Sequence, residues 1–220
     1  MNEARNMKRR RVLYLVAGMA LLVAAFVVWP RGPKEPVYQG KPLTQWINEA
    51  HDVGIFDQTE ETDAAMRAFG TNAVPFLLNE FTRPISHRRG RLYAWVNGHS
   101  SFKIHLRTDE ERVRVAGLGL LLLETNAAPA LPVLARYLDD PNRDVFVISI
   151  FCNVGDDALP YLTAGFASTN VVAITNVLRT LQRMAHRSVP AQEAIAAALS
   201  HPSPAVRAAA AACQRYLLTH

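Results

Sequence analysis

A short proline-marked motif recurs along this chain and constrains its fold more than any other feature. Residues 69–81 read FGTNAVPFLLNEF, and residues 154–166 read VGDDALPYLTAGF. A looser copy, ETNAAPALPVLARYL, occupies residues 124–138, and a degenerate copy, RSVPAQEAIAAAL, occupies residues 187–199. Internal repetition of this kind indicates a chain built by stacking one supersecondary unit on the next.

Each copy is predicted to contain the second helix of a helical hairpin, because its apolar residues fall at positions 0, 3, 4 and 7 of one helix face. In the first three copies these residues are Val74, Leu77, Leu78 and Phe81; Leu131, Leu134, Ala135 and Leu138; and Leu159, Leu162, Thr163 and Phe166. In the fourth copy the stripe shifts two residues onward, to Ala191, Ala194, Ile195 and Ala198.

Proline-containing corners divide the chain into successive helix pairs. The segments DDPNRDV at 139–145 and SHPSPAV at 200–206 each contain a polar stop, a proline, a polar cap and a valine. An earlier pair is predicted from Asp63 to Phe69 and from Val74 onward, and we find no convincing strand pattern. The later first helices are expected at about 109–124, 142–153, 170–185 and 204–218, and their partners at about 128–138, 157–167 and 189–199.

The N-terminus combines a basic cluster with an apolar stretch. Residues 8–11 read KRRR, and the eighteen residues from 12 to 29 carry no charge. Eighteen helical residues extend about 27 Å, close to the roughly 30 Å of bilayer hydrocarbon. Basic residues before a span favour the cytoplasmic side. We therefore expect a cytoplasmic tail at 1–11, a transmembrane signal anchor at 12–29, and the remaining chain outside the cytoplasmic membrane.

A cleaved signal peptide is the alternative reading of the same segment. Val23, Ala24 and Ala25 offer a small-residue cleavage site. The apolar run continues beyond them to Trp29, which exceeds the roughly 7 to 15 residues of a signal-peptide core. Under either reading the body of the protein is exported.

The exported part is predicted to begin with a tether and to be nearly neutral. Residues 30–41 are rich in proline and glycine and predict an extended linker before a domain at 42–220. After residue 30 the chain holds 19 of its 24 basic residues and 18 of its 19 acidic residues. This balance opposes nucleic-acid binding, which needs a continuous basic surface.

The corners and the A-[VL]-P-x-L second helices resemble those of HEAT repeats over residues 62–218. The D-x-x-x-x-V corner pattern is matched by Asp139, Asp140, Pro141, Arg143 and Val145. With the N-terminal segment, the chain looks like a membrane-anchored member of bacterial envelope type. The resemblance implies an all-α fold, a right-handed α-solenoid of about four helix pairs that serves as a scaffold or binding surface. Residues 82–108 depart from the repeat pattern.

This departing segment, the basic insertion at 82–108, is the first candidate binding site. It contains six Lys and Arg residues and no acid. Guanidinium groups suit carboxylates and phosphates, and aromatic side chains can stack beside them. We expect an anionic head group, another anion or an acidic protein to bind within 83–107; the candidate residues are Arg88, Arg89, Arg91, Tyr93 and Trp95. Alternatively, the six acids between Glu49 and Asp63 neutralise the insertion, or solvent screens it.

The second candidate is a protein-binding surface on the outward side of the second helices. Positions 2, 5 and 6 after each first stripe residue would line the inner face of a stack, and exposed aromatic residues there suit peptide recognition. These positions hold Phe76, Asn79 and Glu80; Val133, Arg136 and Tyr137; and Tyr161, Ala164 and Gly165. Arg136, Tyr137 and Tyr161 are the preferred binding residues. Alternatively, Phe76 and Tyr161 seal neighbouring units.

No sequence motif indicates a metal, a cofactor or a catalytic group. His87, His99 and His105 lack metal-site spacing, and Cys152 and Cys213 fall in apolar helical stretches typical of small buried hydrophobes. The first hypothesis is therefore a noncatalytic, membrane-anchored scaffold with an unidentified protein partner. The second is a HEAT-type enzyme, or a small-molecule or anion-binding protein, that uses the basic insertion.

Overall fold

The computed structural model of the chain describes residues 14, 16, 18–20, 32–54, 59–99 and 106–219. The chain divides into two compact units, Met1–Pro33 and Lys34–His220. In the first unit, residues 14, 16 and 18–20 are helical. The predicted cytoplasmic tail and most of the predicted transmembrane helix lie outside the described residues.

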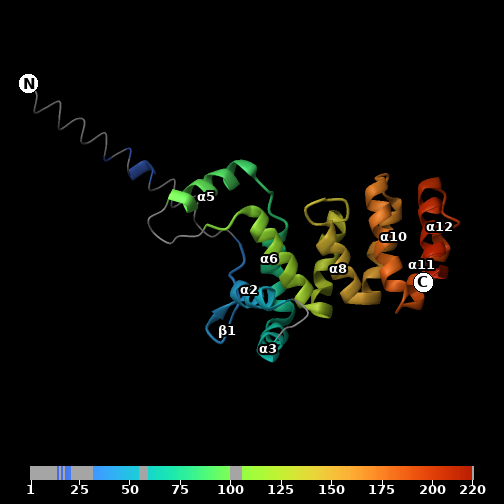
Figure 1. The fold of residues 1–220 in the computed structure, drawn as a ribbon, viewed down its shortest axis with the longest axis horizontal. Coiled ribbons are helices and arrows are strands. Elements are labelled where there is room, and N and C mark those ends of the chain that lie inside the picture. The colour runs from blue at the N-terminus through green and yellow to red at the C-terminus, as the bar shows by residue number, and fades with distance from the viewer. Residues whose placement is uncertain are drawn as a thin grey trace, which may run out of the picture. The chain divides into compact units, whose positions relative to one another are not determined.

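The second unit is mostly helical, as Figure 1 shows, which confirms the all-α class. Short 3-10 turns precede or extend the proline-containing second helices, at Gly70–Ala73, Glu124–Ala130, Ala135–Tyr137, Gly155–Ala158 and Gly165–Ala167. The α-helices are α2 (Leu43–Val53), α3 (Glu60–Phe69), α4 (Val74–Phe81), α5 (His87–His99), α6 (Asp109–Leu122), α7 (Leu131–Leu134), α8 (Asp144–Val154), α9 (Leu159–Ala164), α10 (Val171–Ala185), α11 (Val189–Ala198) and α12 (Pro204–Thr219).

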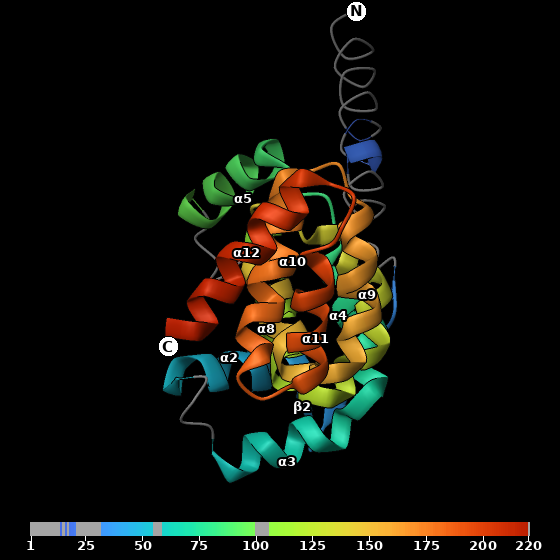
Figure 2. The same cartoon turned by 90° about the vertical axis from the view of Figure 1, so that its right-hand side faces the viewer.

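The helices pack in the order in which they occur along the chain. Helix α6 packs against α8, α8 against α10, and α10 against α12. On the side of the second helices, α4 packs against α6, and α9 and α11 pack against α10 and against each other. Helix α2 lies against α6, and α3 lies against α2, so the row in Figure 1 begins with these two helices; Figure 2 views the row from its α12 end.

The predicted apolar stripe forms the core of each hairpin. Its residues at positions 0, 3 and 7 are buried in the first two copies, namely Val74, Leu77 and Phe81, and Leu131, Leu134 and Leu138. In the third copy Leu162 and Phe166 are buried. The shifted register of the fourth copy is also confirmed, because Ala191, Ile195 and Ala198 are buried.

Three copies of the motif share one unusual backbone angle at the end of the first helix. The φ angle is 48° at Gly70, 51° at Glu124 and 82° at Gly155. Positive φ reverses the chain direction after a helix and is strained for any residue with a Cβ atom. Glycine meets this requirement in two copies, whereas the second copy places a glutamate there.

The predicted tether is partly folded, contrary to the expectation of an extended linker without strands. Strands β1 (Val37–Tyr38) and β2 (Lys41–Pro42) form an antiparallel hairpin. Its turn has φ angles of 50° at Gln39 and 78° at Gly40, the signs that a type I′ turn requires. The Trp46 Nε1 group donates to the Tyr38 carbonyl at 3.3 Å, and the Tyr38 ring packs against Phe69. The hairpin therefore belongs to the helical unit.

One described segment, Asp144–Ala167, is long and apolar enough to cross a membrane, with a mean hydropathy of 1.4 over its most apolar stretch. It contains α8 and α9, which the positive φ at Gly155 separates. Phe151 and Leu162 are fully buried in the helical core. The apolar character of this segment is thus accounted for by core packing.

Candidate anion-binding surface on the basic insertion

The basic insertion contains a helix, α5, that the sequence did not predict. The Arg89 N–H donates to Ser86 Oγ at 3.4 Å, and the Gly90 N–H donates to the Ser86 carbonyl at 3.0 Å. Ser86 thus occupies the position of a helix N-cap. This serine is the one sequence signal that could have located α5, because Gly90 and Gly98 weaken its helix propensity.

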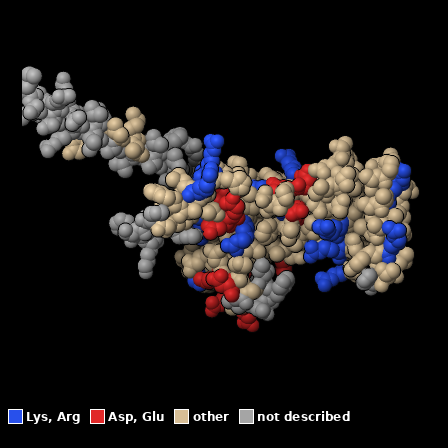
Figure 3. Space-filling view, turned by 45° about the horizontal axis from the view of Figure 1, so that its top comes forward, with Lys and Arg blue, Asp and Glu red and all other residues tan. Residues whose placement is uncertain are grey.

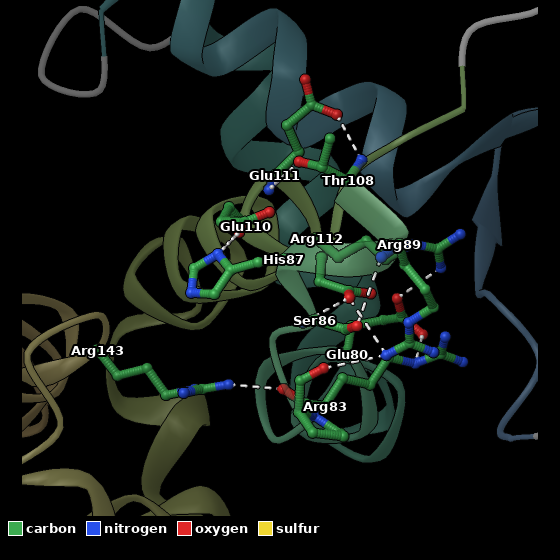
Figure 4. Close-up of polar contacts among 12 residues, drawn as sticks. Glu80, Arg83, Ser86, His87, Arg89, Thr108, Glu110, Glu111, Arg112 and Arg143 are labelled. Carbon is green, nitrogen blue, oxygen red and sulfur yellow. Dashed lines mark hydrogen bonds and ion pairs between the residues drawn. The ribbon is translucent and has the colours of Figure 1, made fainter. Parts of the chain in front are cut away.

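A buried carboxylate holds the start of α5 against α6. Asp109, the first residue of α6, is 3% exposed, and its Oδ2 atom accepts the Ser86 N–H at 3.0 Å. The same oxygen lies 3.2 Å from Arg89 Nη2, which also donates to the Pro84 carbonyl. Removing a charge from water is costly unless it is paired and hydrogen-bonded. Arg89 therefore anchors α5 (Figure 4).

The N-terminus of α6 and the far end of the insertion are fixed by local hydrogen bonds. Thr108 and Glu111 form a capping box, in which each side chain accepts the backbone N–H of the other. His87 Nδ1 lies 3.7 Å from Glu110 Oε1. Near the end of α5, the Asn97 side chain accepts the Leu106 N–H at 2.8 Å and donates to the Leu106 carbonyl at 3.0 Å.

Arg143 ties the start of the insertion to the corner before α8. Its side chain is almost fully buried, with the whole residue 5% exposed. Its Nε donates to the Phe81 carbonyl at 2.8 Å, and its Nη2 donates to the Arg83 carbonyl at 2.6 Å. The guanidinium also pairs with Asp140 and lies 5.1 Å from the centre of the Tyr137 ring. Arg143, a residue of the repeat corner, thus binds the backbone carbonyl groups at the end of α4 and just after it (Figure 4).

The arginines of the insertion are neutralised in part by acids of α4 and α6. Glu80 lies 3.2 Å from Arg83 Nε and 3.0 Å from Arg112 Nη1. In the ranges that the structure describes, no recorded ion pair joins the insertion to the acids between residues 49 and 63. Glu49 instead accepts from Lys41 at 2.9 Å, and this hydrogen bond, with one from Gln45, lowers the pKa of Glu49. Asp109 and Glu110 of α6 lie beside α5, 3.2 Å from Arg89 and 3.7 Å from His87 respectively.

Four side chains of α5 form its outward face, which we define as Arg88, Arg91, Leu92 and Trp95. All four are exposed, Leu92 by 56% and Trp95 by 61%. Neither Arg88 nor Arg91 forms an ion pair with another described residue. Of the five candidates in the insertion, three therefore lie on this face, Arg89 lies at the base of α5, and Tyr93 is half-buried.

The second candidate surface is only partly accessible. Arg136 is exposed, whereas Tyr137 is half-buried beside Arg143 and packs edge-on against Phe81, with ring centres 5.9 Å apart. Tyr161 and Phe76 are half-buried against the core. The packing of these aromatic side chains agrees with the alternative reading, in which they seal neighbouring units.

Polar residues also meet in a small surface depression between α3 and the turn after α6. Its lining includes Asp63, Arg67, Glu124 and Asn126. The space inside is about 110 Å³, below the roughly 300–1,000 Å³ of typical small-molecule sites. Within the described part of the chain, no group of three or more His, Cys, Asp or Glu residues is placed to hold a metal ion.

Charge is distributed unevenly along the helical unit. Residues 34–81 contain eight acidic and three basic residues, whereas residues 158–220 contain five arginines and one glutamate. Figure 3 shows this difference on one face, where acidic side chains are spread over the half of the unit that begins with α2 and α3 and only basic ones mark the α12 end. The near-neutral total thus conceals an acidic beginning and a basic end.

No protein-family model, curated protein or solved structure matches the chain significantly. The likeness to HEAT repeats therefore rests on the motifs and helix packing of this chain. What the protein does is inferred from its own residues and contacts.

Proposed function

We propose that this protein is a noncatalytic scaffold, a membrane-anchored HEAT-like α-solenoid that presents a protein-interaction surface outside the cytoplasmic membrane. The observation that carries the proposal is the successive packing of α6, α8, α10 and α12, each against the next. Units that contact only their neighbours build elongated surfaces, which repeat proteins use for binding. We assign about four pairs to the solenoid, with right-handed stacking as in the HEAT family.

The shared turn geometry supports a repeat origin of these pairs. Gly70, Glu124 and Gly155 each have a positive φ and each begin the 3-10 turn that precedes the proline-containing helix. Positive φ is uncommon outside glycine, so its recurrence at equivalent positions is specific. Packing and backbone geometry thus point to the same unit.

The proposed anchor rests on composition and on the described residues of the first unit. Residues 12–29 are uncharged and follow KRRR. Tyr14, Val16 and Met19 are helical and exposed within that unit. Exposed large apolar side chains on a helix are favourable in hydrocarbon and unfavourable in water. We propose a single-pass protein with its N-terminus in the cytoplasm and its helical unit outside, in the periplasm or the extracellular space.

The proposed contact surface includes Arg136 and one edge of the first helices. Val145 is the second residue of α8, and Val171 and Val172 are the first two residues of α10; all three are exposed. The segments before these helices are adjacent, because Asn170 Nδ2 donates to Asp139 Oδ2 at 2.8 Å, and α8 itself packs against α10. Exposed apolar side chains that lie close together suit a protein partner.

Proximity labelling from the outer side of the membrane tests this function. A labelling enzyme fused to the C-terminus of the full chain is expected to tag exported proteins, and Arg136→Glu with Val171→Asp is expected to remove at least one of them. Arg215→Glu, an exposed charge reversal on α12, is the matched control. Labelling of cytosolic proteins alone, or an unchanged tagged set in the surface variant, would overturn the proposal.

Anion binding by the basic insertion is the second candidate, favoured by Arg88 and Arg91, which are exposed and form no ion pair with another described residue. An enzyme or small-molecule-binding protein that uses 82–108 would show saturable binding of a soluble anion. Calorimetric titration of the full chain in neutral detergent with inorganic phosphate distinguishes this candidate from the scaffold. Saturable binding that Arg88→Gln abolishes would favour it.

A further inference from the structure

We propose that the outward face of α5 lies on the anionic bilayer in which the chain is anchored. This inference rests on the proposed membrane anchor and names the partner of the basic insertion. The occupant of the face is a phospholipid surface that carries negatively charged head groups. The evidence is the placement of two arginines and two apolar side chains on one exposed side of one helix.

The outward face is continuous and separate from the side of α5 that holds the domain. At 100° per residue, Arg88, Arg91, Leu92 and Trp95 fall within about 100° of the helix surface. On the other side, Arg89 contacts Asp109, and the Asn97 side chain bonds to the backbone of Leu106. A lipid contact therefore leaves the anchoring contacts of α5 in place.

The charge of the outward face has no ion-pair partner among the described residues. Of the acids beside α5, Asp109 is paired with Arg89, and Glu110 lies 3.7 Å from the exposed ring of His87. Arg88 and Arg91 are exposed and form no ion pair within the described ranges. Cations near an anionic bilayer surface gain free energy from its negative potential.

The apolar half of the face favours a bilayer over an acidic protein surface or a soluble anion. Tryptophan prefers the interface between head groups and acyl chains, and leucine partitions into the acyl region. Around the helix, Trp95 lies between Arg88 and Arg91, and Leu92 lies beside Arg88. The long arginine side chains can reach phosphates while their aliphatic parts stay in contact with apolar groups. A soluble anion would not account for the exposure of both apolar side chains.

The short link to the proposed anchor keeps the domain near the membrane. Four residues separate Trp29 from Lys34, and an extended chain between them reaches about 18 Å at most. Figure 1 shows α5 at the same end of the row of helices as the start of this unit, β1 and α2. Tethering at such a distance gives α5 a high effective concentration at the bilayer surface, so that even a weak contact can form.

Fluorescence quenching by brominated lipids tests the contact in the full chain. Trp29→Phe removes the tryptophan of the proposed anchor, and Trp46 is sheltered because it is 3% exposed. The chain is reconstituted into vesicles of phosphatidylcholine with or without phosphatidylglycerol. We expect Trp95 emission to shift to the blue and to be quenched only when phosphatidylglycerol is present, and we expect high salt to weaken the effect. A Trp95→Phe variant gives the background.

Charge variants decide whether the arginines hold the face on the membrane. Arg88→Gln with Arg91→Gln is expected to lower the docking constant by about an order of magnitude. Arg179→Gln with Arg183→Gln, which removes two exposed arginines of α10, is the matched control and is expected to leave quenching unchanged. Equal quenching in both double variants would overturn the proposal.

Vesicle flotation separates this inference from the proposed anchor. A chain that floats with both kinds of vesicle but shows no Trp95 quenching keeps its anchor and overturns the α5 contact. A chain that floats only with phosphatidylglycerol, and loses flotation in the Arg88 and Arg91 variant, binds through α5 and contradicts the anchor. Failure to float with either vesicle overturns both.

Discussion

Arg143 is the side chain on which the joint between the repeat corner and the basic insertion depends. Replacing it with methionine removes the donors for the Phe81 and Arg83 carbonyls and leaves Asp140 without its ion pair. Because buried acceptors without partners are costly, we expect a loss of about 2–3 kcal/mol in the free energy of unfolding. Denaturant titration followed by helical circular dichroism measures this loss. Arg136→Met, an exposed control, is expected to change stability by less than about 0.5 kcal/mol.

Gly70 and Glu124 offer opposite tests of the shared turn. A Cβ atom at Gly70 would meet no neighbour within 4 Å, so Gly70→Ala is destabilising through the backbone alone. Glu124→Gly relieves the same strain and is expected to be stabilising. Each effect is about 1 kcal/mol. Thermal unfolding of the two variants measures them, and shifts of the same sign would contradict the shared geometry.

The two cysteines are expected to be unreactive at neutral pH. Cys152 is half-buried and Cys213 is buried, neither forms a disulfide, and burial raises the pKa of both thiols. Since the reactive species is the thiolate, alkylation of the native protein should be slow at pH 7–8 and should accelerate above about pH 9. A raised pKa means that the stabilising effect of the neutral thiols is present at neutral pH and is lost as the pH rises through the folded pKa. Rapid modification at pH 7 under native conditions would contradict this burial.

Among the helices, α6 carries two glycines that permit close packing with its neighbours. A Cβ atom at Gly119 would lie 2.6 Å from Ile47 and 2.8 Å from Leu77, both fully buried. A Cβ atom at Gly117 would lie 2.7 Å from Phe146, which is half-buried and has room to move. We expect Gly119→Ala to lose about 2–3 kcal/mol despite the higher helix propensity of alanine, and Gly117→Ala to lose less. Thermal unfolding ranks the two variants, and the reverse order would contradict the packing.

The helices that follow a strong apolar period could be predicted from the sequence, and the others could not. The predicted ranges of α6, α8, α10 and α12 agree with the structure within two residues at each end. Helix α5 has no such period, because its outward face carries Leu92 and Trp95 while its inner side is only half-buried. Each strand of the β1–β2 hairpin has only two residues. The hairpin is held by the contact between Tyr38 and Trp46, a pairing that the sequence does not reveal.

The candidate site shows the same limit of sequence reasoning. Its arginines can be found from the sequence, because they form a run of one charge. Their pairing with Asp109 and Glu80 cannot be predicted in this way, because it depends on how the 82–108 segment folds back onto α4 and α6. Whether an arginine anchors α5 or faces outward depends on the side of α5 that it occupies. The sequence does not show these sides, because α5 has no apolar period.

For the complete molecule, the proposal joins a helical stack to a membrane through a short chain segment. The acidic stretch at residues 34–81 follows that segment in the sequence, and the basic α12 lies at the opposite end of the row of helices from α3. A single-pass protein with this arrangement would expose the outward face of α5 and the proposed protein-contact surface on one side of the membrane. Its orientation is therefore the property on which the function depends.

Cysteine accessibility in spheroplasts measures that orientation in the full chain. Ser200→Cys places one exposed thiol in the corner before α12, and Asn2→Cys places one in the proposed cytoplasmic tail; the native thiols are sheltered. A membrane-impermeant maleimide is expected to label Ser200→Cys in intact spheroplasts and Asn2→Cys only after lysis. Labelling in the reverse order, or recovery of the intact chain from the soluble cytosol, would contradict a helical scaffold held outside the membrane.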